Sequence, residues 1–388
     1  MKKSKKRIIT VISVLLTLCI GFSSSALALQ ENFDALAQPI GRYILSDPAP
    51  SDIVDYASEH AAGALTDYLL AKYNGVVTED MLYQHQLGTP YTISADPDQM
   101  VCSFPIILEN TIVYTMEIMR IPKEDGTYSY SYQLSSAEEE MSLLSSNPLM
   151  PTQIVYYTND NAEKYILTSD REYRSVKTQM SAKSLSAWRV KSTGTAINVM
   201  TPVPYAQNAD ITTRAGDFYV IYPSFREIQS QSSIWCLGFT TAEAIYKSKG
   251  ILATSTLIAN WTGNNWGIIP TNTGIPEDKA VDYANSKGCY VIKGPVSPRN
   301  NIVSSLNNIL QDELEYYQKF SIIGITHEEG SSITHSALYC GYTANSYYIW
   351  DPYRSDVSIV SRDDDYGFFY TPRYGQQSHY PYRIIHNF

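Results

Sequence analysis

The sequence predicts an α+β protein of two domains. In the first half, apolar residues recur at helical spacing over residues 52–73 and then alternate with polar ones over 101–121 and 126–134, as they do in strands. In the second half, helical segments again come before strands, and this order is typical of α+β folds. A chain of 388 residues is long enough for two such domains.

The first 28 residues read as a secretory signal peptide. Residues 2–7 carry five positive charges, residues 8–22 are apolar, and Ala26-Leu27-Ala28 has the small residues of a cleavage site. A membrane anchor is the alternative, but an apolar run of about 15 residues is shorter than the roughly 18 to 20 that cross a bilayer. We therefore expect a secreted, extracellular protein with no membrane attachment after removal of the signal.

The composition fits an exported globular protein. Loss of the signal removes five positive charges, so the net charge of -10 becomes -15, which argues against nucleic acid as a partner. Hydrophobic residues make up 44% of the chain and charged residues 18%, so packed cores are expected rather than disorder.

The domain boundary is expected in a stretch with Pro202 and Pro204, few charges and no sustained periodicity. We assign residues 29–191 to a first domain, 192–214 to a linker and 215–388 to a second domain. Such a linker is a natural place for proteolytic cleavage.

Cys236 is the candidate nucleophile. A polar loop leads to it, and the helical pattern that it opens ends at Gly250. At the start of a helix, the dipole and the backbone amides favour the thiolate, and a nearby imidazolium favours it further. The alternative is that Cys236 is a small buried hydrophobic residue with no chemical role.

His335 is the candidate base, and Asp351 the residue that orients it. His335 begins the strand-like run HSALYCGY, and Asp351 ends the following strand-like run, SYYIWD, before Pro352. An acceptor there can bind the far ring nitrogen and fix the tautomer. His327 is a rival base and Asn345 a rival orienting residue.

An amide donor is also expected ahead of the nucleophile, to bind the oxyanion that forms when the thiolate attacks a carbonyl. Gln229 and Gln231 are both candidates, and we favour Gln229. No metal or cofactor is expected, because HEEGSSITH lacks the HExxH spacing. Cys289 and Cys340 could form a disulfide or remain buried thiols.

These motifs, REIQSQSSIWCLGFT followed by HSALYCGY and YYIWDP, resemble those of staphopains and related papain-like cysteine peptidases of Gram-positive bacteria. The resemblance covers residues 215–388. It implies a papain-like domain with a Cys236/His335 dyad that cleaves polypeptides through an acyl-enzyme. It also implies that the first domain is a propeptide that inhibits the enzyme until the linker is cut, near Arg214-Ala215.

The sequence departs from the staphopain pattern at two positions. The glutamines lie seven and five residues before the cysteine, where six is usual, and Asp351 replaces an asparagine. The aspartate is closer to bacteriocin-leader peptidases and their secreted relatives. Other readings are a cysteine-based peptidoglycan hydrolase or transglutaminase, and a catalytically inactive surface binding protein.

Overall fold

The strands lie in two sheets, the larger of which carries the candidate site. The computed structural model describes residues 43–73, 75–96, 99–137, 152–156, 164–167, 173–175, 181–182, 195–204, 218–229, 235–266, 274–294, 310–326, 335–362, 380–386 and 388. All of them belong to one compact unit, Gly41–Phe388. The expected signal peptide, residues 1–28, lies outside them. None of the helices in the described ranges is long and apolar enough for a membrane span.

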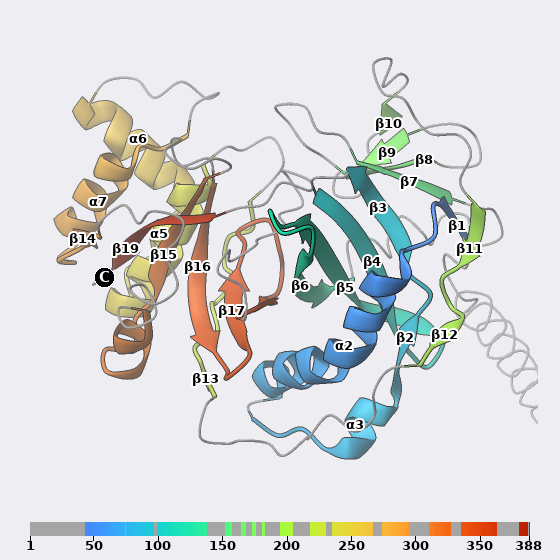
Figure 1. Cartoon of the computed structure of the whole chain (residues 1–388). Helices are drawn as coiled ribbons and strands as arrows, with labels where there is room; N and C mark the ends of the chain where they lie inside the picture. Colours follow the sequence, from blue (N-terminus) through green and yellow to red (C-terminus); the bar gives the residue numbers. More distant parts are fainter. Residues whose placement is uncertain are drawn as a thin grey trace, which may run out of the picture. The chain divides into compact units, whose positions relative to one another are not determined.

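The larger sheet joins the two halves of the chain (Figure 1). Every pairing in its described part is antiparallel. Its strands follow the order β12 (Pro202–Val203), β2 (His85–Gly88), β4 (Gln99–Leu108), β5 (Thr111–Pro122), β6 (Tyr128–Ser136), β18 (Ser358–Ser361), β17 (Ser346–Trp350), β16 (His335–Tyr342), β15 (Ser321–Thr326), β19 (Tyr380–His386) and β14 (Ile292–Lys293). In addition, β3 (Tyr91–Asp96) pairs with β4, and β13 (Tyr219–Val220) with β16.

The smaller sheet belongs to the first half of the chain. Its order is β10 (Ser181–Ala182), β9 (Tyr173–Ser175), β8 (Lys164–Leu167), β7 (Thr152–Tyr156), β1 (Tyr43–Ser46) and β11 (Thr195–Asn198). The β1–β7 pair is parallel, and the other pairs are antiparallel.

The helices confirm the predicted α+β class. Those with printed bounds are α2 (Ser51–Lys72), α3 (Glu79–Tyr83), α5 (Cys236–Lys249), α6 (Ser255–Trp266) and α7 (Glu277–Ser286), and residues 310–315 are also helical. The predicted helix over 52–73 is thus α2, and the one predicted to open at Cys236 is α5. The strands predicted over 101–121 and 126–134 are β4, β5 and β6.

The β4–β5 hairpin shows how local sequence sets the register of the sheet. Glu109 and Asn110 form its two-residue turn, with φ of 49° and 63°. Positive φ at both positions is typical of a type I′ turn, whose twist matches that of the flanking strands, and asparagine tolerates it well.

The two halves of the chain meet where β6 pairs with β18. Leu134 lies opposite Ile359 and Gln133 opposite Val360. The helix α2 packs on β5, β6 and β18, and one continuous hydrophobic cluster includes buried residues from both halves. The described parts of residues 43–191 and 218–388 therefore share a sheet and a core in the full-length chain.

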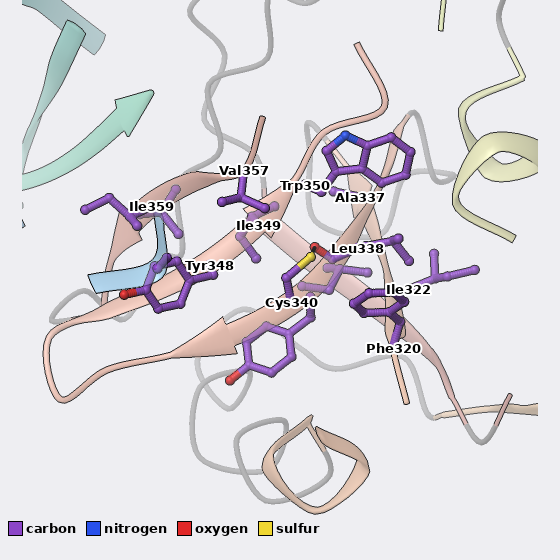
Figure 2. Packing of buried hydrophobic residues seen from close by; sticks show 14 of the residues in the cluster. Phe320, Ile322, Ala337, Leu338, Cys340, Tyr348, Ile349, Trp350, Val357 and Ile359 are labelled. Atoms are coloured by element: carbon purple, nitrogen blue, oxygen red, sulfur yellow. Dashed lines mark hydrogen bonds between the residues drawn. The ribbon is translucent and has the colours of Figure 1, made fainter. Parts of the chain in front are cut away.

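Buried hydrophobic side chains on and next to strands β15 to β18 form the core of the second half (Figure 2). The side chains there are fully buried or nearly so, and they include Phe320, Ile322, Leu338, Cys340, Tyr348, Trp350 and Ile359. Side chains of successive strand residues alternate between the faces of a sheet, so burial of both Leu338 and Tyr339 shows that β16 is covered on both faces.

The two strands in the described part of the expected linker, β11 and β12, pair with strands of the first half. β11 pairs with β1 and β12 with β2, whereas β13, just after the linker, pairs with β16 in the second half. The change from one half to the other thus falls between Val203 and Tyr219. Most of that interval, residues 205–217, lies outside the described residues.

Candidate active site

Cys236 is the first residue of α5. The helix begins there because the carbonyl of Trp235 accepts hydrogen bonds from the N–H groups of Gly238 and Phe239, at 2.8 and 3.1 Å. It ends at Gly250, whose φ of 66° is left-handed. The thiol thus lies at the positive end of the helix dipole, as expected from the sequence.

Gly238 lets α5 approach its neighbours closely. A Cβ at this position would lie 2.7 Å from the side chain of Ile275 and 3.3 Å from the Cα of Ser255. Any larger residue would therefore require the tip of the Ile275 side chain to move and would press against Ser255 at the start of α6.

His335 is the first residue of β16 and lies close to the start of α5. The next residue, Ser336, has its hydroxyl 3.3 Å from that of Thr240 in α5. The imidazole is fully buried, and its Nε2 lies 3.2 Å from Oδ1 of Asp351. The structure therefore brings together the predicted base and its predicted orienting residue.

The charges around His335 favour its protonated form. Burial by itself lowers the pKa of the imidazole, but the Asp351 carboxylate and a hydrogen bond with Cys236 outweigh it and raise the pKa to about 9. The Cys236 thiol is consequently a neighbour of the ring in space, although the two residues are far apart in the chain. This arrangement suits a thiolate–imidazolium pair.

Asp351 is held as a charged acceptor at the end of β17. Its Oδ1 also accepts a hydrogen bond from the backbone N–H of Tyr353 at 3.0 Å. Burial would raise the pKa of Asp351, but His335, the Tyr353 amide and Arg354 lower it overall.

The ring of Tyr353 covers one face of the imidazole. The two rings are nearly parallel, at 18°, with centroids 5.8 Å apart, and Tyr353 is fully buried. Tyr353 was not predicted as a site residue. Its position two residues after Asp351 is the signal that could have identified it.

Gln229 lies beside the turn that follows Asp351. Its backbone N–H donates to the carbonyl of Pro352 at 2.7 Å, and its side chain is fully buried. The structure therefore ties the segment with the favoured amide donor to the segment with the orienting carboxylate. The alternative donor, Gln231, lies outside the described residues.

The loop before Gln229 is fixed to the helices by two carboxylates. Glu243 of α5 accepts hydrogen bonds from the amide and hydroxyl of Ser224 at 2.6 to 2.8 Å. Glu227 accepts from the amide and hydroxyl of Ser255, at the start of α6, at 2.7 Å each. Neither glutamate was predicted as a site residue, although a buried glutamate in α5 needs such partners.

Two alternatives left open by the sequence are not supported. Asn345 lies in the turn between β16 and β17, at the opposite end of these strands from His335, so it cannot orient the imidazole. The possible disulfide is absent, because Cys289 and Cys340 are both free and buried. The rival base, His327, lies outside the described residues.

Searches for relatives do not identify the chain: no protein-family model matches it, and no curated protein matches it significantly. Within the described ranges, no three His, Cys, Asp or Glu side chains are grouped as metal ligands would be.

Proposed function

We propose that this chain is the precursor of an exported, papain-like cysteine endopeptidase. The observation that carries the proposal is the position of His335, between the Asp351 carboxylate at 3.2 Å and the Cys236 thiol at the start of a helix. Each of the three groups has the partner that nucleophilic catalysis by a cysteine needs.

The proposed reaction begins with proton transfer from Cys236 to His335. The Cys236 sulfur attacks the carbonyl carbon of a peptide bond, and the Gln229 amide with N–H groups of the first turn of α5 stabilises the oxyanion. His335 then gives its proton to the departing amine, which leaves a thioester on Cys236. A water molecule that loses its proton to His335 hydrolyses the thioester and restores the thiol.

The reacting groups are buried in the full-length chain. In the full-length chain, Cys236 is 8% exposed and His335 0%. A polypeptide substrate can reach the Cys236 sulfur only if the residues that cover it move. We propose that the first domain, residues 29–191, is a propeptide that acts as an intramolecular inhibitor and that the linker is cut on activation.

The test is protein hydrolysis by material secreted from a host that lacks other extracellular proteases. We expect the wild type to mature and degrade a denatured protein, and Cys236→Ala to do neither. Cys289→Ala, which removes another buried free thiol, should remain active. Activity of Cys236→Ala equal to that of the wild type would overturn the proposal.

Two other functions predict different outcomes. A peptidoglycan hydrolase would release fragments from purified cell wall and leave denatured protein intact, and a transglutaminase would cross-link the protein. A catalytically inactive binding protein would do neither and would not react with a papain-directed epoxysuccinyl inhibitor.

A further inference from the structure

The contact between the two halves of the chain includes a buried carboxylate from the first half. Asp67, in α2, is 7% exposed. Its Oδ2 accepts hydrogen bonds from the hydroxyls of Thr343 and Ser346, at 2.8 and 2.6 Å, and its backbone oxygen accepts one from the Tyr348 hydroxyl. All three donors belong to the β16–β17 hairpin of the second half.

Two tyrosines of the first half add further hydrogen bonds across the same contact. The Tyr68 hydroxyl donates to Asp356 at 2.7 Å. The Tyr132 hydroxyl lies 2.9 Å from that of Ser346, and its backbone N–H donates to the Ser361 hydroxyl at 3.2 Å. Together with the β6–β18 pairing, these bonds satisfy polar groups that would otherwise be buried without partners.

This contact lies away from the candidate active site. Thr343 and Ser346 flank the turn of the hairpin, whereas His335 begins β16 and Asp351 follows β17 at the other end. At about 3.3 Å per residue, β16 separates the two ends by roughly 23 Å. The contact around Asp67 therefore does not involve the reacting groups.

A cut in the linker leaves these contacts in place. β12 pairs with β2 and β13 with β16, so a break within residues 205–217 separates strands that already belong to different halves. Such a break removes the covalent connection but no pairing or hydrogen bond of the contact around Asp67.

We propose that β18, Tyr348 and residues 343–346 form a binding surface for the first half of the chain, residues 43–204, as a separate polypeptide. Cleavage of the linker then produces a two-chain complex, and release of the first half requires disruption of the contact around Asp67. Departure of the first half also exposes the edge of β18, which invites pairing with other strands.

The experiment uses the full-length Cys236→Ala protein with a site for a specific protease inserted within residues 205–217. After cleavage, size-exclusion chromatography with light scattering at about 1 μM protein reports whether the two pieces travel together; stable association at this concentration needs a dissociation constant well below 1 μM. We expect one species that contains both pieces in equal amounts. Two separate species would overturn the proposal. Because the variant lacks the proposed nucleophile, this result does not depend on the peptidase reaction.

Variants of two aspartates in α2 locate the contact. Asp67→Ala, or Ser346→Ala if that variant fails to fold, should weaken association about 10- to 100-fold, because buried hydroxyls lose a charged partner. Asp52→Asn is the matched control, since Asp52 pairs with Arg120 and Tyr130, both in the first half. The urea concentration that separates the cleaved pieces should fall for Asp67→Ala or Ser346→Ala and stay close to that of the parent for Asp52→Asn. Equal values for the parent and for Asp67→Ala or Ser346→Ala would contradict the assigned contact.

Discussion

His335 Nε2 lies 3.2 Å from Oδ1 of Asp351, which places the imidazole at the end of one strand against the carboxylate at the end of the next. Because Nε2 faces the carboxylate, Nδ1 is the ring nitrogen available to the thiol. Burial of the carboxylate strengthens its effect on the ring, since the interior screens charges less than water does. The electrostatic state of the site can therefore be tested by titration.

The first prediction concerns the pH dependence of Asp351 variants. The pKa of His335 is raised above its usual value of 6.5 to about 9, so its protonated form, and the stability from its ion pair, is fully present below about pH 6.5 and lost as the pH rises through about 9. We expect kcat/KM of processed enzyme to fall on the alkaline side near pH 9. Asp351→Asn should move this limb to lower pH.

The asparagine oxygen can still accept a hydrogen bond from Nε2–H, so Asp351→Asn should retain more activity than Asp351→Ala, for which we expect a loss of about 10²-fold or more. Asp312→Asn, at an exposed position, is the control and should leave the profile unchanged. An alkaline limb that stays in place in Asp351→Asn would contradict the assigned role of the carboxylate.

The second prediction distinguishes the two candidate amide donors. Gln229→Ala should lower kcat about 10²- to 10³-fold with a smaller effect on KM, because an oxyanion donor acts mainly in the transition state. Gln231→Ala should change kcat by only a few-fold. Steady-state kinetics on a peptide substrate measures both, and the opposite ranking would assign the role to Gln231.

The third prediction concerns processing. The N-terminus of secreted, mature protein should lie between Ser192 and Asp217, within or just after the expected linker, and close to Ala215. Ala215 falls where the chain passes from one half to the other, between β12 and β13. Cys236→Ala should not mature in a host without other proteases. N-terminal sequencing checks both points; maturation of Cys236→Ala in that host would exclude self-processing, and an active chain that begins near Leu29 would exclude a removable first domain.

The fourth prediction uses the pH dependence of stability at Asp67. Burial raises the pKa of this carboxyl to about 6, against the hydrogen bonds from Ser346 and Thr343, which lower it. Since the usual value is 3.8, the folded state holds a proton between pH 3.8 and 6 that the unfolded state has lost. Asp67 thus makes the fold less stable as the pH rises through this window.

Asp67→Asn should remove this dependence, which amounts to about 3 kcal/mol for a shift of this size. Thermal unfolding of full-length Cys236→Ala, with and without Asp67→Asn, at pH 4 to 7 measures it. A constant difference in stability between the two proteins reflects the replacement of the carboxyl by an amide. The test is therefore how this difference changes with pH. Parallel curves would contradict a protonated Asp67 at low pH.

The sequence predicts the elements with strong periodicity and the residues at their ends. α2, β4, β5 and α5 follow from helical or alternating spacing, and Cys236, His335 and Asp351 each mark the end of such an element. Whether a residue lies at the end of a helix or strand can be predicted from the local sequence pattern. The distance between His335 and Asp351 follows because antiparallel neighbours bring those ends together.

Contacts between distant segments are not predicted in the same way. β18 is only four residues long, and its pairing with β6 joins segments that no local pattern relates. The roles of Glu243 and Asp67 likewise depend on the hydroxyls that reach them from other elements, Ser224 in one case and Thr343 and Ser346 in the other. The sequence around a helical carboxylate does not show which hydroxyl will donate a hydrogen bond to it.

The most direct test of the central claim is the location of a covalent adduct in processed protein treated with an epoxysuccinyl inhibitor. We expect a single adduct on Cys236, identified by peptide mass spectrometry, and its loss in His335→Ala. Absence of an adduct on Cys236 in processed wild-type protein, or reaction at Cys102, Cys289 or Cys340 instead, would contradict a Cys236/His335 dyad.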